Sequence, residues 1–336
     1  MTEIKKILPY ELDYDDESFR QSTPYEIAEY KAKRLSNFSI ADLGAGIGIQ
    51  SIFFSKYFQK VVAIEKEKKR YKMAERNFKK LNLKNVTLYH GDVFKEDFFD
   101  IVSSCEIVFS DPSRPLKGDS WNLEMLSPPP EKIISYFKNN ENFSFDIPVQ
   151  ISREKIPSNF ELEYISLNGE IKRLSLYLGK IKKYERSALM LPEEIRIVYN
   201  GNIDRKLEEV ELPLHYIYEI DPAIAYADLI PEFFGMYKNM YIFLNEKKRK
   251  LATSDNFYYD KIMKNIYVVN FLAKNFKEVK ENLKNNDARK VFLRYSIESR
   301  EYYKIKNAIE KNLNGENDFY IFKKGEKYIG AIKIKK

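Results

Sequence analysis

The sequence is poor in the residues that build disulfide frameworks and metal clusters. It has one cysteine, Cys105, and only two histidines, His90 and His215, among 336 residues. A single cysteine excludes a disulfide within the chain and any cysteine-cluster metal site, and two histidines do not favour a histidine-rich zinc site. We therefore expect no metal, and the low cysteine content is typical of a reducing cytoplasm.

Long apolar runs are also missing. No stretch of 18 or more apolar residues occurs, and the start MTEIKKILPYELDYDDE is too acidic for a signal peptide, so we expect a soluble, cytoplasmic protein with no membrane partner. Hydrophobic residues nevertheless make up 44% of the chain, which is enough for the cores of two domains. The 57 Lys and Arg against 50 Asp and Glu give a net charge of +7, which permits a polyanionic partner without requiring one.

Helix and strand patterns alternate through the first half of the chain. Thr23-Pro24 predicts a helix start, because threonine caps helices and proline is tolerated in the first turn. Short apolar strands are then predicted in FSIADLG, KVVAIEKE, NVTLYHGDVF and CEIVFSDP, with helical spacing after the first two. This order predicts a parallel sheet with helices on both faces, and ligands of such sheets bind beyond the carboxyl ends of the strands.

A glycine-rich segment, DLGAGIG, lies between the first strand and the helix that follows it. Glycine allows the backbone to turn sharply there and to approach a ligand closely. Glu65 and Asp92 follow at the ends of the next two strands, where carboxylates can bind ribose hydroxyls and an adenine amine. The spacing differs from the dinucleotide fingerprint G-x-G-x-x-G, and an acid before the first glycine suits a cationic sulfonium ligand better than a pyrophosphate.

Together, these residues resemble the class I S-adenosylmethionine-dependent methyltransferases over residues 23–190. The resemblance implies S-adenosylmethionine as the cofactor. It also implies which residues contact each part of this cofactor. Asp42, Gly44, Gly46 and Gly48 would line the methionine end, Glu65 would bind the ribose, and Asp92 with Val93 would hold the adenine.

The loop DPSRP follows the fourth strand and, by this resemblance, faces the methyl donor. Amine methyltransferases carry D-P-P-Y or N-P-P-Y there, in which the acid and a proline carbonyl hold the amine and the aromatic ring stacks on the base. In this chain Arg114 takes the aromatic position, and arginine can stack on a base or bind a phosphate. The predicted catalytic residues are Asp111, Pro112 and Arg114, acting on a nitrogen or hydroxyl. Cys105 precedes the strand, which argues against cysteine-dependent methylation of pyrimidine C5.

Further motifs narrow the resemblance to methyltransferases with a C-terminal THUMP-like domain: TPYEIAEYKAKRL, DPSRP, IPSNFELEYISLNGEIKRLSLYLG, YIYEIDPAIAYADL and ARKVFLRYS, in this order. Alternation about Asn168-Gly169 predicts a hairpin that closes a Rossmann-like, seven-stranded methyltransferase sheet. The expected domains are an N-terminal extension and helix (1–36), the class I methyltransferase domain (37–195) and a C-terminal THUMP-like α/β domain (196–336). The resemblance implies RNA, either tRNA or rRNA, as the substrate.

Basic residues near the C-terminus form the candidate RNA-binding surface: Arg289, Lys290, Arg294, Arg300 and Lys304. Neighbouring tyrosines can stack on bases, although a solvated surface over a tyrosine-containing core explains the same pattern. The predicted function is an RNA methyltransferase of class EC 2.1.1. The alternatives are a methyltransferase acting on protein or a small molecule, and a non-catalytic nucleoside-binding scaffold. The sequence leaves open the acceptor atom and the oligomeric state.

Overall fold

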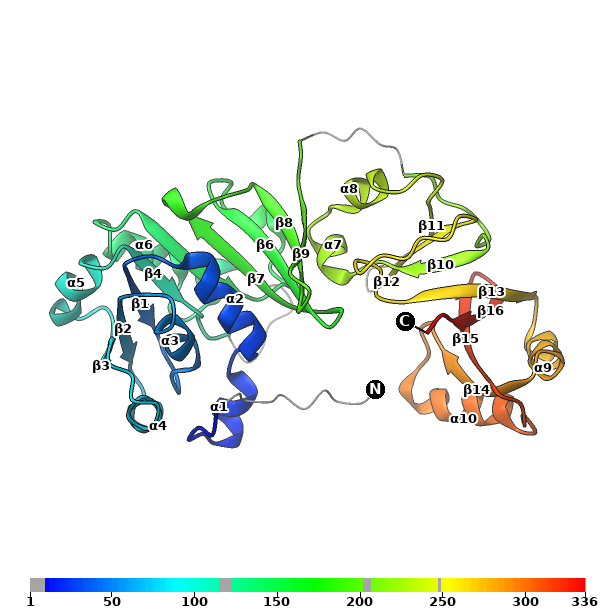
Figure 1. The fold of residues 1–336 in the computed structure, drawn as a ribbon, viewed down its shortest axis with the longest axis horizontal. Coiled ribbons are helices and arrows are strands. Elements are labelled where there is room, and N and C mark those ends of the chain that lie inside the picture. The colour runs from blue at the N-terminus through cyan, green and yellow to red at the C-terminus, as the bar shows by residue number, and fades with distance from the viewer. Residues whose placement is uncertain (1–9, 115–121, 202–206, 247–248, 336) are drawn as a thin grey trace. The chain divides into compact units, whose positions relative to one another are not determined.

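The computed structural model describes residues 10–114, 122–201, 207–246 and 249–335. The chain divides into two compact units, Met1–Tyr199 and Asn200–Lys336 (Figure 1). This boundary falls after the one expected at residue 195, because the segment LPEE is a turn and not a linker. Strands β8 (Arg186–Leu191) and β9 (Ile195–Val198) pair antiparallel across it.

The N-terminal unit contains a nine-stranded sheet with the strand order β3-β2-β1-β4-β5-β7-β6-β8-β9. Its first five strands are parallel, and β7 runs antiparallel to β5. The sheet has two strands more than the seven expected. Besides β8 and β9 its strands are β1 (Ser39–Leu43), β2 (Lys60–Glu65), β3 (Val86–His90), β4 (Ile107–Ser110), β5 (Asn142–Ile147), β6 (Glu161–Leu167) and β7 (Glu170–Leu178).

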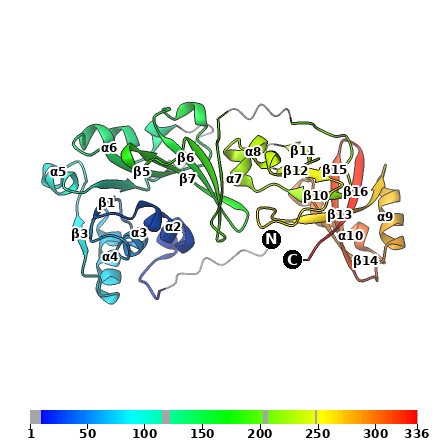
Figure 2. The same ribbon diagram turned by 45° about the horizontal axis from the view of Figure 1, so that its top comes forward.

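Helices cover both faces of this sheet. Figure 2 shows α2, α3 and α4 on one face and α5 and α6 on the other. The helices are α1 (Asp16–Gln21), α2 (Tyr25–Leu35), α3 (Ile49–Phe54), α4 (Lys68–Lys80), α5 (Glu96–Ser103) and α6 (Pro130–Tyr136), with short 3-10 turns at Leu123–Met125, Arg153–Lys155 and Gly179–Ile181. Every residue of β1 is buried, since the strand is paired on both sides and covered on both faces.

The predicted hairpin at Asn168-Gly169 is confirmed. It joins β6 to β7, and both turn residues have positive φ angles, 53° and 72°. An Asn-Gly pair suits such a turn because these two residue types adopt the left-handed region at low cost. The hairpin carries the long strand β7 back across the sheet beside β5, where its side chains reach the carboxyl end of β4.

The C-terminal unit has a seven-stranded sheet in the order β11-β12-β10-β13-β16-β15-β14. Asp221 caps helix α7, since its side chain accepts the backbone N–H of Ala223 at 2.8 Å. Within the described residues, no helix is both long enough and apolar enough to cross a membrane. The elements are β10 (Tyr216–Glu219), α7 (Pro222–Tyr226), α8 (Ile230–Gly235), β11 (Tyr241–Glu246), β12 (Arg249–Ser254), β13 (Ile266–Ala273), α9 (Phe276–Asn285), β14 (Ala288–Leu293), α10 (Ser299–Glu310), β15 (Asn317–Lys324) and β16 (Lys327–Lys333).

Candidate active site

A cavity of about 870 Å³ lies beyond the carboxyl ends of β1 and β4. Four stretches of the N-terminal unit line it, within residues 18–26, 42–50, 109–114 and 167–173, together with Arg70. The predicted glycine loop and the DPSRP loop therefore share one cavity. Its volume is in the range of cofactor and substrate sites.

The glycine loop is shaped by backbone conformations that other residues rarely adopt. Gly48 has a φ of +90°, and a Cβ there would lie 2.3 Å from a ring carbon of Phe78. Gly44 and Gly46 also have positive φ, but a Cβ at either position would meet open space within 4 Å. Gly48 is thus required by packing against α4, whereas Gly44 and Gly46 leave room for a ligand to contact the backbone.

Asp42 is a buried acid at the floor of this cavity, with 2% of its surface exposed. The Ser51 hydroxyl donates a hydrogen bond to its carboxylate at 2.5 Å. Burial raises the pKa of Asp42 to about 7, and the neighbouring carboxylates of Asp111 and Glu65 contribute to the rise. Such a group would be stabilised in its charged form by a cationic ligand.

Gln50 adds an unsatisfied acceptor to the same cavity. Its Nε2 donates to the carbonyl of Ala28 at 3.1 Å, while its buried Oε1 accepts no hydrogen bond within the described residues. Buried polar atoms are rarely left without a partner. S-adenosylmethionine carries an ammonium and a sulfonium group, so the carboxylate of Asp42, the orphaned Gln50 oxygen and the open glycine backbone fit its methionine end.

Four of the residues predicted to bind the cofactor do not line this cavity: Gly48, which packs against Phe78, and Glu65, Asp92 and Val93. Glu65 supports the glycine loop, since its two oxygens accept the backbone N–H groups of Gly46 and Glu67, each at 2.7 Å. Asp92 pairs with Lys66 at 2.8 Å and accepts the N–H of Phe94, and these bonds lower its pKa. Ribose and adenine binding by these residues stays a prediction.

The DPSRP loop contributes Asp111, Pro112 and Arg114 to the cavity wall. Arg173, on β7, donates from Nη1 to both carboxylate oxygens of Asp111, at 2.8 and 2.9 Å. Thr23 also donates to Asp111, at 3.3 Å, and accepts from Arg173. Burial raises the pKa of the Asp111 carboxyl, and the Arg173 guanidinium opposes this rise.

The expectation that Thr23 caps a helix is wrong. Helix α2 begins at Tyr25 with Pro24 in the capping position, and no side chain caps it. The Thr23 hydroxyl is instead committed to Asp111 and Arg173 in the candidate active site. Because proline fixes its own backbone angle at the helix start, the helix does not need the threonine side chain.

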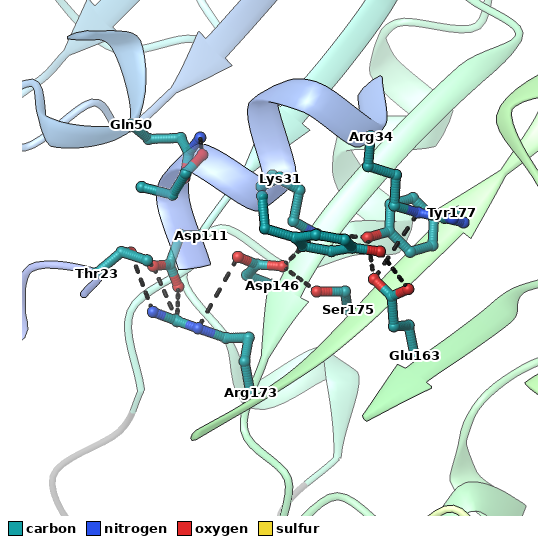
Figure 3. Close-up of polar contacts among 12 residues, drawn as sticks. Thr23, Lys31, Arg34, Gln50, Asp111, Asp146, Glu163, Arg173, Ser175 and Tyr177 are labelled. Carbon is teal, nitrogen blue, oxygen red and sulfur yellow. Dashed lines mark hydrogen bonds and ion pairs between the residues drawn. The ribbon is translucent and has the colours of Figure 1, made fainter. Parts of the chain in front are cut away.

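A buried network of charges, absent from the predictions, extends behind Asp111 (Figure 3). Asp146, on β5, lies 3.8 Å from Nε of Arg173 and 2.7 Å from Nζ of Lys31, and the side chains of Asp146 and Lys31 are fully buried. Lys31 donates to the Tyr177 hydroxyl, which donates to Glu163. Further charged groups and a tyrosine complete the network around Glu163: Arg34, Arg196, Glu161 and Tyr30. Polar residues at alternate positions of two adjacent strands were the sequence signal for it.

The candidate RNA-binding residues in the C-terminal unit differ in their surroundings. Arg294 is paired with Glu219, and Arg289 donates two hydrogen bonds to Asp318 at 2.9 and 3.0 Å. Lys290, Arg300 and Lys304 are exposed. Glu219 and Arg294 come from the two segments YIYEIDPAIAYADL and ARKVFLRYS, so these motifs meet in a partly buried ion pair of the core.

The strand order β3-β2-β1-β4-β5-β7-β6, with a glycine loop after β1, is the class I methyltransferase fold. Residues 26–153 match the model of a family described as ribosomal RNA adenine dimethylase. The N-terminal unit is therefore an S-adenosylmethionine-dependent methyltransferase domain, and S-adenosylmethionine is its cofactor. The matched segment contains Asp42 and Asp111 but ends before Arg173 and before the C-terminal unit.

One solved structure supports the fold over 95% of the chain. A protein of Porphyromonas gingivalis W83, provisionally described as a methyltransferase, is similar with a TM-score of 0.76 at 15% identity, covering 95% of this chain and 82% of its own. An RNA methyltransferase from Salinibacter ruber in complex with S-adenosyl-L-homocysteine is similar over 47% of this chain and 92% of its own, with 18% identity and a TM-score of 0.33. No curated protein matched the chain in sequence.

Proposed function

We propose that this protein methylates RNA, either tRNA or rRNA, at a nitrogen or hydroxyl held by the DPSRP loop. The observation that carries the proposal is the shared cavity: Asp42 and the glycine loop line one part of it, and Asp111 to Arg114 line another. A methyl donor bound on the glycine loop would lie in the same space as a nucleophile bound on Asp111. Such positioning of two reactants is a major source of catalysis in group transfer.

Each loop residue has a defined task in this proposal. Asp111 accepts a hydrogen of the nucleophile, the carbonyl of Pro112 accepts a second where an amine is the substrate, and Arg114 binds the base or its phosphate. Arg114 is exposed at the cavity wall, where a nucleic acid can reach it. A planar guanidinium serves both tasks, since it can stack on a base or form two parallel bonds to a phosphate.

RNA as the substrate is supported by the family match, whose description names ribosomal RNA, and by the basic net charge of +7. The C-terminal unit, which we expect to be THUMP-like, presents the RNA. Its best candidate surface is one face of α10, where Arg300, Tyr303, Lys304 and Asn307 follow helical spacing and are all exposed. Tyr303 exposes 71% of its surface, so its ring is accessible for stacking on a base.

The first experiment tests the methyltransferase part. Calorimetry should show S-adenosylmethionine binding that is lost in Asp42→Ala and retained in Asp111→Ala. Nucleoside mass spectrometry of total RNA from a deletion strain should then show one missing methylated nucleoside, restored by the parent gene and not by Asp111→Ala. An unchanged nucleoside profile with intact donor binding would favour a protein or small-molecule substrate. Absence of donor binding would favour the non-catalytic scaffold.

A second experiment tests the RNA surface. We expect Arg300→Ala with Lys304→Ala to weaken RNA binding and to reduce the slope of log affinity against log salt by about 2, one for each lost phosphate contact. Arg289→Ala is the matched control, because its charge is already paired with Asp318. Equal losses in the control and in the double variant would contradict an RNA surface on α10.

A further inference from the structure

The carboxylate of Asp111 is held by two side chains from distant parts of the chain, Arg173 on β7 and Thr23 before α2. Arg173 Nη1 bonds to both of its oxygens, and Thr23 bonds to Oδ2 alone. Within the described residues, Oδ1 therefore accepts one hydrogen bond and Oδ2 accepts two. Because an ionised carboxylate offers about four acceptor positions, one position on Oδ1 stays available. Asp111 lines the cavity, so this position is accessible to a ligand.

Arg173 is itself anchored in the core of the unit. Only 9% of its surface is exposed, and its Nε lies 3.8 Å from the buried Oδ2 of Asp146. Asp146 is held in turn by Lys31 at 2.7 Å and by the Ser175 hydroxyl at 2.6 Å. Figure 3 shows these side chains converging from α2, β5 and β7. An arginine fixed at both ends cannot follow Asp111 if the loop moves, so it sets the orientation of the carboxylate.

We propose that Arg173 is the positioning residue of the methyl-acceptor site: it holds the Asp111 carboxylate ionised and in one orientation, leaving a single lone pair for the acceptor. This inference rests on the proposed function, since it assigns Asp111 to the acceptor. Arg173 lies outside the segment that matches the family model, which ends at residue 153. Arg173 does not touch the reacting atoms and acts through Asp111.

The charges around Asp111 explain why an anchored cation is needed. Two acids face Asp111 from neighbouring strands, Asp42 on β1 and Asp146 on β5, and two arginines face it, Arg114 in its own loop and Arg173 on β7. Burial and the charge of Asp146 both raise the pKa of Asp111, and Arg173 provides the largest opposing effect. Without Arg173, protonated Asp111 would become a donor at the atom where the acceptor needs an oxygen lone pair.

The test compares Arg173→Gln, which removes the charge, with Arg173→Lys, which keeps the charge and loses the two-point contact. Lys180→Gln is the control, since Lys180 follows the far end of β7 and is exposed with Glu141 as its partner. The titration of Asp111 is followed by carboxyl ¹³C NMR on the full chain labelled at aspartate, with Asp111→Asn assigning the signal. We expect Arg173→Gln to raise the pKa of Asp111 by about one unit or more, and Arg173→Lys to reverse most of this change.

Methyl transfer provides the second readout. In single-turnover assays Arg173→Gln should lose about 100-fold in rate, with the acid limb of the pH profile moved to higher pH, while donor affinity stays within about threefold of the parent. Arg173→Lys should recover the pH profile but only part of the rate. A merely structural arginine would change rate and donor affinity together and leave the pH profile in place, and that outcome would overturn the inference.

The inference and the proposed function fail in distinguishable ways. An unchanged Asp111 titration in folded Arg173→Gln overturns the positioning role, whatever the methylation assay shows. A shifted titration together with no methylation of any RNA by the parent protein overturns the proposed function and leaves the ionisation of Asp111 by Arg173 established. If Arg173→Gln does not fold, Arg173→Lys carries the test through the rate, because it keeps the charge and loses the two-point contact. Thr23→Val is the comparison, because it removes one hydrogen bond to Asp111 and leaves the Arg173 charge in place. A parental methyl-transfer rate in folded Arg173→Lys would then overturn the inference.

Discussion

The N-terminal unit contains two sets of ion pairs that look alike in sequence and differ in every physical respect. One is the buried network between α2 and the sheet, in which Lys31 and Asp146 have no exposed side-chain surface. The other joins the acidic segment, residues 11–17, to helix α4 through four exposed pairs: Glu11 with Lys80, Asp13 with Arg76, Asp15 with Lys69, and Glu17 with Arg70. In both sets, acidic residues occupy every second position of a short stretch of chain.

Exposure to solvent determines how much each set of ion pairs contributes to stability. Exposed pairs are screened by water and salt, and most of them add little stability. Buried pairs cost free energy to assemble, but removal of one partner leaves a charge that water cannot reach. The buried network therefore fixes the position of Arg173 and, through it, of Asp111, whereas the ion pairs of the acidic segment stay in contact with solvent. The following changes separate the two sets.

The largest effect is expected from Lys31→Met, which removes the cation nearest to the buried Asp146 carboxylate. We expect a loss of about 3 to 5 kcal/mol in the free energy of unfolding, the usual result of breaking a buried pair. Urea unfolding followed by circular dichroism measures the loss. The double variant Lys31→Met with Asp146→Leu is the control, and it should recover at least half of the lost free energy of unfolding. A loss below 1 kcal/mol in the single variant would contradict this account.

Asp42→Asn should increase the free energy of unfolding, whereas Lys31→Met decreases it. The parent chain holds a proton on Asp42 up to about pH 7 when folded, whereas the unfolded chain releases it near the ordinary aspartate pKa of 3.8. The free energy of unfolding therefore falls as pH rises through this window, and the asparagine variant escapes that loss. At pH 8 we expect Asp42→Asn to be more stable by up to about 4 kcal/mol, with no difference at pH 4.

Stability and binding should diverge in this variant. Donor affinity should fall by about 30-fold or more, the cost of removing one member of a buried charge contact. Melting curves and calorimetry on the same preparations measure both. Ser51→Ala is the milder control, because it removes one hydrogen bond to Asp42 and leaves the carboxylate in place. A variant that is destabilised at pH 8 would show that Asp42 serves the fold and not a cationic ligand.

The position of Asp42, Gly44 and Gly46 at the cavity was predictable because its information is local. Strand, glycines and the acids at strand ends follow one another within DLGAGIG and the two strands after it, and the parallel topology places them at one edge. The same reasoning predicted the Asn168-Gly169 hairpin, which is confirmed. It expected the domain boundary at residue 195, and the two compact units divide between Tyr199 and Asn200, after β9.

The acceptor half was only partly predictable. The loop holding Asp111 was found, but its partner Arg173 lies 62 residues further along the chain on a strand whose neighbours depend on the whole sheet order. Nothing in the local pattern of IKRLSLYLG distinguishes a buried arginine from a solvated one. The basic cluster near the C-terminus was similarly ambiguous, since Arg294 faces Glu219 and Arg300 faces solvent.

The smallest effect is expected where charge is exposed. Asp13→Asn with Asp15→Asn should lower the Tm slightly in dilute buffer, and the difference should vanish at 1 M NaCl, where the screening length is about 3 Å. The loss caused by Lys31→Met should persist at that salt concentration, because ions cannot enter the buried network.

The backbone contacts of the acidic segment provide the control for that salt test. Asn77, fully buried on α4, accepts the N–H of Asp13 at 2.6 Å and donates to the carbonyls of Asp13 and Ile47 at 3.1 and 2.9 Å. These bonds survive Asp13→Asn, so Asn77→Ala should weaken donor binding at every salt concentration by loosening the glycine loop. Equal salt dependence in Asn77→Ala and in the double variant would show that charge, and not the buried amide, holds the segment beside the cavity.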